Sequence, residues 1–305
     1  MFKMFLILFI SLNIYAKDEI TPIPLNIFYE KDKASLGKKL FFDTILSQDG
    51  TLACVTCHQL PGSGADTQSF SVGINGTKTS VNTPTVLNAR FNFSQFWDGR
   101  AKNLHEQALA PVINPMELGS SIEELIAKLN ASSYKKEFKK LFEEGITKDT
   151  ISSVIAEFEK ALTTPHSRFD KYLRGDSKAL NEQEKRGYTR FKELGCISCH
   201  NGVNIGGNMY QKFGIMLPYE EVIGGRVHVT GRERDRDVLK VPTLRNIALT
   251  APYLHDGSLN TLLEIIADMK EHQLGIVGAD AQDRDIEAFL KTLTGETPAI
   301  LEEVK

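Results

Sequence analysis

The sequence contains few of the residues that several common protein classes require. Its 305 residues include only four cysteines, too few for a disulfide-rich scaffold. Lys and Arg number 36 against 39 Asp and Glu, a formal net charge of -3, so the composition argues against nucleic acid as a partner. With 41% hydrophobic and 25% charged residues, the chain has the composition of a globular protein and not of a disordered or multi-span membrane protein.

Long hydrophobic runs are also scarce, and the one that stands out opens the chain. A single basic residue, Lys3, precedes an apolar run from Met4 to Ile10, and a weaker stretch ends at Ala16. This pattern predicts a secretory signal peptide over residues 1–16, cleaved after Ala16, and export to the periplasm. An uncleaved N-terminal anchor is the alternative.

Helical periodicity dominates the rest of the chain, and strand signals are few and short. A helix is expected over residues 34–42, and capping boxes at Ser121 with Glu124 and at Asn181 with Glu184 begin two more. Apolar spacing predicts further helices over residues 151–162, 262–269 and 286–293. The stretch from Leu60 to Arg90 is a long irregular loop, which in a compact domain is usually functional. The predicted fold is mainly α.

The two halves of the chain follow a common plan of helix, cysteine motif, loop and helices. Pro165 follows the end of the helix predicted over residues 151–162. We therefore predict two domains joined at an interface, one over residues 17–165 and one over residues 166–305.

All four cysteines fall in two copies of the CxxCH pattern. The motif residues are Cys54, Cys57 and His58 in CVTCH, and Cys196, Cys199 and His200 in CISCH. CxxCH is the attachment motif of haem c. Two thiols two residues apart on a turn can reach both vinyl groups of one porphyrin, which places the next imidazole under the iron. The sequence predicts two covalently attached haems c, with both histidines as iron ligands.

The four cysteines have two alternative uses. The two CxxC pairs could supply four thiolates to zinc, or could form disulfides in an exported protein. The pairs lie in separate halves, and each is followed directly by a histidine, so haem attachment is favoured over both.

A second axial ligand is available in the second half but not in the first. Met269 lies downstream of CISCH on a predicted helix, whereas Met209 and Met216 are weaker rivals in a Gly-rich loop. A core-packing role is the alternative for Met269. Between Cys57 and the domain boundary the only Met is Met116, and the only His after the motif is His105. We expect an open first haem and a closed second haem.

A series of segments in order makes the chain similar to the bacterial dihaem cytochrome c peroxidases, a family that also includes the maturation enzymes of methylamine dehydrogenase. The segments include LGKKLFFD, CVTCH, FWDGRAKNLHEQALAPVINPMEL, CISCHNGVNIGG, VPTLRNIALTAPYLHDGS and DMKEHQLG. The resemblance implies two cytochrome c-like domains and a reaction that reduces hydrogen peroxide to water. It also implies a small soluble c-type cytochrome, or a cupredoxin, as electron donor, and a homodimer.

The resemblance also assigns roles to single residues. Trp97 matches a tryptophan between the two haems, a relay for electrons. Glu117 matches the acid/base residue over the peroxidatic haem, and Gln107 matches a second polar residue beside it. Met269 matches the axial Met of the electron-transferring haem.

A calcium site and further haem partners are implied in the same way. Asn82 and the carbonyl groups of Thr250 and Pro252 match a calcium site at the domain interface, where water must complete the ligand set. His255 and Arg245 resemble haem-propionate or interface partners.

The sequence differs from many family members in one loop, which the resemblance places beside the open face of the first haem. Many members carry a histidine there, in SVGH, which blocks the oxidised peroxidatic iron, whereas this sequence reads SVGI with Ile74 in that place. An alkyl side chain cannot bind iron, and the alternatives that remain are Lys78 as a ligand or a refolded loop. The hypothesis is that the first haem stays five-coordinate and needs no reductive activation.

Two rival functions remain at this point. The chain could oxidise residues of a partner protein, as the maturation enzymes do, although those enzymes have tyrosine in place of the axial Met. It could also be a non-catalytic dihaem electron carrier, a reading that the presence of Glu117 and Gln107 opposes.

Overall fold

The computed structural model describes residues 19–220, 222–278 and 280–302, so the predicted signal peptide lies outside the described residues. The first half contains α1 (Lys31–Phe42), α2 (Cys54–Cys57), α3 (Leu104–Gln107), α4 (Ala110–Ile113), α5 (Ile122–Asn130), α6 (Tyr134–Leu141) and α7 (Lys148–Ala161). The second half contains α8 (Arg168–Leu173), α9 (Glu182–Glu193), β1 (Tyr210–Lys212), α10 (Val227–Thr230), β2 (Val238–Lys240), α11 (Leu262–Leu274), α12 (Asp283–Lys291) and α13 (Ala299–Glu302). The two strands pair antiparallel, with Tyr210 opposite Lys240. The expected mainly α fold is confirmed.

Local sequence signals explain where the helices begin. Ser121 and Asn181 accept hydrogen bonds from the backbone N–H groups of Glu124 and Glu184, so both predicted capping boxes form. Helix α1 begins at Lys31, before the predicted start at residue 34. The difference arises because its first turn is polar, and apolar periodicity does not reveal such a turn.

Each half is built around one helix crossing at which two backbones touch. A Cβ on Gly37 of α1 would lie 1.9 Å from the carbonyl oxygen of Val154 in α7, and a Cβ on Gly187 of α9 would lie 1.9 Å from that of Asp285 in α12. Only glycine permits such an approach. The helix before each CxxCH motif therefore crosses a later helix in the same way, as two cytochrome c-like domains require.

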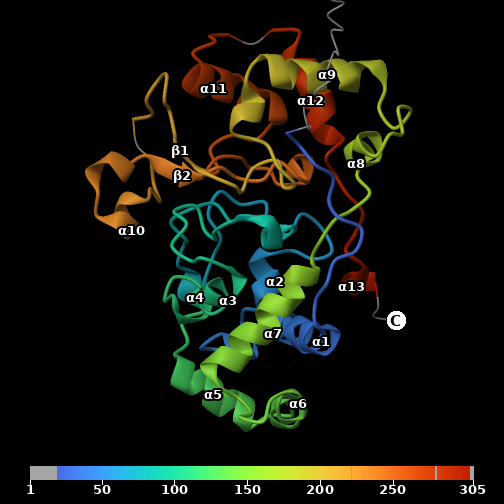
Figure 1. The fold of residues 1–305 in the computed structure, drawn as a ribbon. Helices are drawn as coiled ribbons and strands as arrows, with labels where there is room; N and C mark the ends of the chain where they lie inside the picture. The colour runs from blue at the N-terminus through green and yellow to red at the C-terminus, as the bar shows by residue number, and fades with distance from the viewer. Residues whose placement is uncertain (1–18, 221, 279, 303–305) are drawn as a thin grey trace, which may run out of the picture.

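Two main apolar cores lie one above the other, and Figure 1 shows α1 to α7 in the lower lobe and α8 to α12 in the upper lobe. The chain ends are exchanged between the lobes. Ile20 packs in the upper core and pairs with Gly202, whereas Ile300 of α13 packs with Phe41 and Phe158 in the lower lobe.

This exchange differs from the predicted domains at both ends. The predicted bounds assign Ile20 to the first domain and α13 to the second, but Ile20 packs in the upper lobe and Ile300 of α13 packs in the lower lobe. Each end is a short segment anchored by few apolar residues. Periodicity cannot reveal the partner of such a segment.

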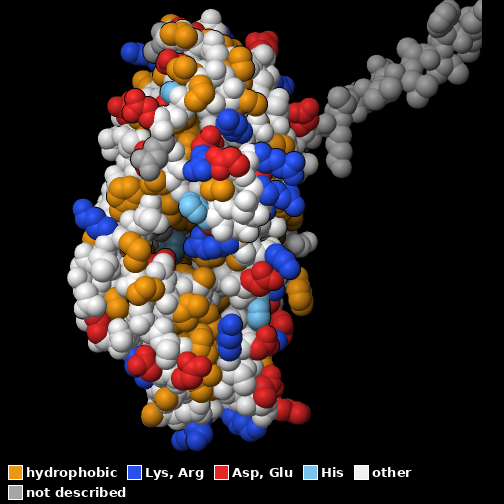
Figure 2. All heavy atoms as spheres, turned by 90° about the vertical axis from the view of Figure 1, so that its left-hand side faces the viewer, with side chains coloured by type: hydrophobic (Ala, Val, Ile, Leu, Met, Phe, Trp, Pro, Cys, Tyr) orange, Lys and Arg blue, Asp and Glu red, His pale blue; other side chains and the backbone are white. Residues whose placement is uncertain are grey.

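On the face shown in Figure 2, positive and negative side chains are interspersed with apolar ones. In the described ranges, none of the helices combines the length and the apolar character that a membrane crossing needs.

Candidate functional site

The first CxxCH motif forms a short helix that positions its histidine. Residues Cys54–Cys57 make α2, and His58 follows as its C-cap. Nδ1 of His58 donates a hydrogen bond to the carbonyl oxygen of Gly64 at 3.0 Å, while burial lowers the pKa of His58. The imidazole is therefore neutral, and its Nε2 lone pair is available to a metal.

The second motif repeats this arrangement on a 3-10 turn over Cys196–Ser198. Nδ1 of His200 donates to the carbonyl oxygen of Ile205 at 3.4 Å, and burial lowers the pKa of His200 to about 4. In both motifs Nδ1 of the histidine is thus held by a backbone carbonyl, and for His200 a backbone hydrogen bond with Pro242 partly opposes the lowering of its pKa.

A phenylalanine from the preceding helix packs against each histidine. The rings of Phe41 and His58 are 6.2 Å apart between centroids, and those of Phe191 and His200 are 6.5 Å apart. Each phenylalanine lies four residues after the glycine at the helix crossing. This repeated Gly-x-x-x-Phe spacing, GKKLF and GYTRF, is a sequence signal that the sequence analysis missed.

The thiols fit haem attachment better than either alternative. All four cysteines are free, so the structure contradicts the disulfide alternative. Burial raises the pKa of Cys54 to about 12 and that of Cys196 to about 11, which disfavours thiolate ligands. Over the described ranges, no group of three or more His, Cys, Asp or Glu side chains is arranged to hold a metal ion. Cys54 packs against the lower core and Cys196 against the upper core, so the two pairs do not combine into one four-thiolate zinc site. Paired thiols beside a histidine whose Nδ1 is held by a backbone carbonyl suit one haem in each lobe.

A largely apolar cavity in the upper lobe brings together most of the residues predicted for the second haem. Its lining includes Cys196, Cys199 and His200 from the motif, Met269 from α11, and the residues Asn82, Trp97, Thr250, Pro252 and His255. Met269 and His200 line the same cavity, and the role of Met269 as an iron ligand stays a prediction.

Trp97 reaches this cavity from the lower lobe. Its indole Nε1 donates to the carbonyl oxygen of Asn82 at 2.9 Å, and its own carbonyl accepts from the backbone N–H of Lys240 at 2.7 Å. Its ring meets that of His255 edge-on, at 6.4 Å between centroids. Arg100, three residues further on, acts electrostatically on Glu117. The segment that carries Trp97 therefore connects the two sites.

His255 is buried in the cavity wall. Its two ring nitrogens have no hydrogen-bond partner within the described residues, and burial lowers the pKa of His255. A buried imidazole of this kind suits an acceptor supplied by a ligand.

The three residues predicted to bind calcium all line the same cavity. The amide nitrogen of Asn82 donates to the carbonyl oxygens of Gln68, at 3.0 Å, and Ser69, at 3.4 Å. Its Oδ1 is thereby turned away from those contacts and can serve as a ligand. The calcium site stays a prediction.

Arg245 has contacts different from those expected of a propionate partner. It is fully buried, and its Nη1 lies 2.7 Å from Oδ1 of Asp170. Its Nε donates to the carbonyl oxygen of Val203 and its Nη2 to that of Thr21. These bonds tie the N-terminal segment to the upper lobe, because a buried guanidinium requires partners for each of its nitrogens.

Glu117 interacts electrostatically with both thiols of the first motif. It is half-buried, and its Oε1 accepts a hydrogen bond from Nδ2 of Asn114 at 2.7 Å. Burial raises the pKa of Glu117, while Asn114 and Arg100 partly oppose the rise. Its charge in turn raises the pKa of Cys54 and of Cys57. A carboxyl group with a raised pKa beside a haem attachment site is suited to acid/base chemistry.

The loop that carries Ile74 is fastened to the turn of Glu117. The backbone N–H of Ile74 donates to the carbonyl oxygen of Glu117 at 2.9 Å. Ile74 is 4% exposed, and a Cβ on Gly119 would lie 2.1 Å from its Cδ1. Lys78 of the same loop is exposed. Ile74 thus fills space beside Gly119 and offers no ligand atom.

Gln107 and His105 lie on α3 but in different surroundings. Gln107 is half-buried, and the next residue, Ala108, belongs to the core against which Cys54 packs. Nε2 of His105 lies 3.2 Å from Oδ1 of Asp149, on the exposed side. Gln107 therefore stands beside the core of the lower lobe, and its place in the peroxide pocket stays a prediction, whereas His105 pairs with α7.

Glu159 of α7 is an acidic residue that the sequence analysis overlooked. It is 4% exposed, its Oε2 has no hydrogen-bond partner in the described part of the chain, and burial raises its pKa to about 8. Its charge also raises the pKa of Cys54. The sequence does contain a signal for it: Glu159 lies four residues after Ile155, on the apolar face of the predicted helix.

Replacing Glu159 with glutamine is expected to remove a pH-dependent loss of stability. The unfolded chain releases the Glu159 proton near pH 4.5, whereas the folded protein keeps it up to about pH 8. Between these pH values Glu159 therefore lowers the free energy of unfolding as pH rises, by up to about 1.4 kcal/mol per pH unit. Thermal unfolding of the holoprotein at pH 5.5, 6.5 and 7.5 should show a variant advantage that grows with pH. The exposed Glu144, changed to glutamine, is the control. An advantage that is constant across this range would contradict the assignment.

Comparison with known proteins places these two sites in a family. The family model of the di-haem cytochrome c peroxidases matches residues 31–178. The cytochrome c551 peroxidase of Nitrosomonas europaea is 47% identical over 297 residues, which cover 95% of this chain and 89% of the relative. The chain belongs to the di-haem cytochrome c peroxidase family. As a member, it is an oxidoreductase with two haem cofactors, and the predicted resemblance is confirmed.

Other relatives of this peroxidase agree with the assignment. The cytochrome c551 peroxidase of Pseudomonas aeruginosa is 41% identical over 281 residues, covering 88% of this chain and 81% of the relative. Among solved structures, a MauG-like protein associated with microbial copper homeostasis matches with a TM-score of 0.80 and 30% identity, covering 91% of this chain and 93% of that one. The two-lobed fold is shared along almost the whole chain.

Proposed function

We propose that this chain is a periplasmic peroxidase that reduces hydrogen peroxide to water at the His58 site, with electrons delivered through the His200 site. The observation that carries the proposal is the half-buried Glu117: burial raises its pKa, and its charge acts on both thiols of CVTCH. The donor is a small soluble c-type cytochrome or a cupredoxin, and the enzyme acts as a homodimer. Residues 1–16 direct its export.

Each haem would be held covalently by the two thiols of its motif. His58 would bind the iron of the first haem, and His200 and Met269 would bind the iron of the second. The free thiols and the hydrogen bonds that hold Nδ1 of both histidines support this assignment. When bound, the first haem would supply the redox chemistry that cleaves the oxygen–oxygen bond of peroxide.

Glu117 moves a proton during this cleavage. It takes a proton from one peroxide oxygen and returns it to the other, so that water leaves in place of hydroxide. The overall reaction consumes one peroxide, two electrons and two protons and forms two waters. Gln107 orients the peroxide from the neighbouring helix. Trp97 lies on the path for electrons from the second haem.

Calcium would bind between Asn82 Oδ1 and the carbonyl oxygens of Thr250 and Pro252, with water completing the shell. The bonds from the amide nitrogen of Asn82 to Gln68 and Ser69 fix the orientation of the side chain and support this site. Because Asn82 also accepts the indole hydrogen bond of Trp97, bound calcium would hold the relay residue in place.

Activity without prior reduction follows from the loop that carries Ile74. In steady-state assays with hydrogen peroxide and a reduced c-type cytochrome, the oxidised enzyme should turn over from the first mixing, with no lag. A strict need for pre-reduction would refute the open first haem, and absence of peroxide consumption under both conditions would refute the peroxidase itself.

Changing Ile74 to histidine is expected to create the dependence that the native chain lacks. An imidazole at this position can bind the iron of the oxidised first haem, so the variant should lose about tenfold or more of its activity unless it is first half-reduced. Ile74→Leu, which keeps an alkyl group beside Gly119, is the matched control. Full activity of the oxidised histidine variant would show that this position does not govern access.

A further inference from the structure

Lys240 is a buried cation that none of the functional roles described so far explains. It ends β2, is 7% exposed and lines the cavity of the second haem. Within the described ranges its ammonium group makes neither a hydrogen bond nor an ion pair, and burial lowers the pKa of Lys240 to about 8. A buried ammonium without a partner is costly, so its environment is incomplete without an anion.

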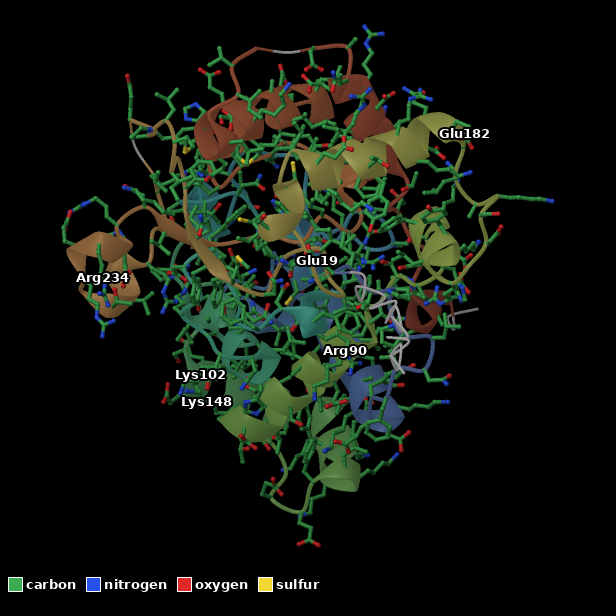
Figure 3. All side chains as sticks on the ribbon, turned by 45° about the horizontal axis from the view of Figure 1, so that its top comes forward. Glu19, Arg90, Lys102, Lys148, Glu182 and Arg234 are labelled. Carbon is green, nitrogen blue, oxygen red and sulfur yellow. The ribbon has the colours of Figure 1, made fainter. Side chains whose placement is uncertain are left out.

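The other buried lysine of the cavity does not share this situation. Lys270 lies 2.7 Å from Oδ1 of Asp283 and 3.5 Å from Oδ2 of Asp280, so its charge is already neutralised. Arg234, in the turn that follows α10 on the same lobe, is exposed to solvent (Figure 3). Lys240 alone among these three is both buried and unpartnered.

His255 lines the same cavity. Both of its ring nitrogens are buried and have no hydrogen-bond partner in the part of the chain that the structure describes. Trp97 links the two residues, because it accepts the backbone hydrogen bond of Lys240 and packs edge-on against His255. An ammonium group and an imidazole N–H in the wall of one cavity are both donors suited to a carboxylate.

We propose that Lys240 binds a propionate carboxylate of the second haem, with His255 as a second donor to that carboxylate, and that this contact fixes the haem edge beside Trp97. The inference rests on the second haem occupying the cavity, as proposed above. Lys240 is then a positioning residue that acts through the haem carboxylate and through its bond to the backbone of Trp97.

The contact has an electrostatic consequence for the second haem. A fixed positive charge beside the haem neutralises the propionate and stabilises the reduced iron, which carries one positive charge fewer than the oxidised iron. Removing the charge should therefore favour the oxidised form. A lysine that only fills space would not have this effect.

The test is the midpoint potential of the second haem in the purified two-haem enzyme. Lys240→Met should lower the equilibrium constant for its reduction about tenfold, which corresponds to 59 mV for one electron. Lys240→Arg, which keeps the charge, should stay within about twofold of the native protein. Arg234→Met, an exposed charge loss on the same lobe, should have no effect.

A second neutral variant covers the case in which Lys240→Met yields no two-haem protein. Lys240→Gln keeps a polar side chain of similar length, and it should lower the constant in the same direction while Lys240→Arg does not. Unchanged potentials in the neutral variants, with both haems present by absorbance, would overturn the carboxylate contact and leave the peroxidase proposal intact. A native protein without the second haem would instead refute the proposed function.

Discussion

Replacing Glu117 with glutamine is expected to lower peroxide turnover by about 10²- to 10³-fold while both haems remain bound. Glutamine preserves the volume of the side chain and can still bond to Asn114, but it cannot exchange a proton with peroxide. The departing oxygen would then leave as hydroxide, a poorer leaving group than water. The effect should appear in kcat/KM for peroxide, measured with reduced cytochrome c in excess.

Glu123→Gln is the matched control, because Glu123 is an exposed glutamate in the first turn of α5. It should retain full turnover and the native haem spectrum. Activity of Glu117→Gln within a few-fold of the native enzyme would show that another group carries the proton. Glu159 would then be the next residue to test, because it too is buried close to Cys54.

Changing Met269 to leucine is expected to lower the midpoint potential of the second haem by more than about 100 mV, or about 50-fold in its reduction equilibrium constant. A thioether ligand favours the reduced iron, and leucine fills similar space without a donor atom. Spectroelectrochemical titration of the holoenzyme measures the shift. The loss should also slow electron delivery to the first haem.

Met216→Leu tests the rival ligand from the Gly-rich loop. Met216 is 61% exposed, and it is absent from the lining of the cavity that holds His200 and Met269. Its replacement should leave the potential unchanged. A shift with Met216→Leu and none with Met269→Leu would exchange the two assignments.

The sequence predicted those parts of the protein that repeat or that follow a fixed spacing. The CxxCH motifs, the capping boxes of α5 and α9 and the placement of Met269 near His200 all rest on such local patterns. Family resemblance added Glu117 and Trp97, for which the residues alone gave no decisive signal.

The remaining features depend on contacts between distant parts of the chain. Arg245 is paired with Asp170 in the core. The two residues lie far apart in the sequence, so no local pattern predicts this ion pair. The exchange of Ile20 and Ile300 between lobes and the isolation of Lys240 are likewise visible only after folding. The sequence around a single lysine in a short strand does not predict which groups surround its side chain.

The most direct test of the central claim, that one haem is open to peroxide and the other is closed by Met269, is the electron paramagnetic resonance spectrum of the oxidised enzyme at rest. The account predicts one high-spin ferric signal from the first haem, lost on addition of peroxide, beside one low-spin signal from the second. Two low-spin signals that peroxide leaves unchanged would contradict it.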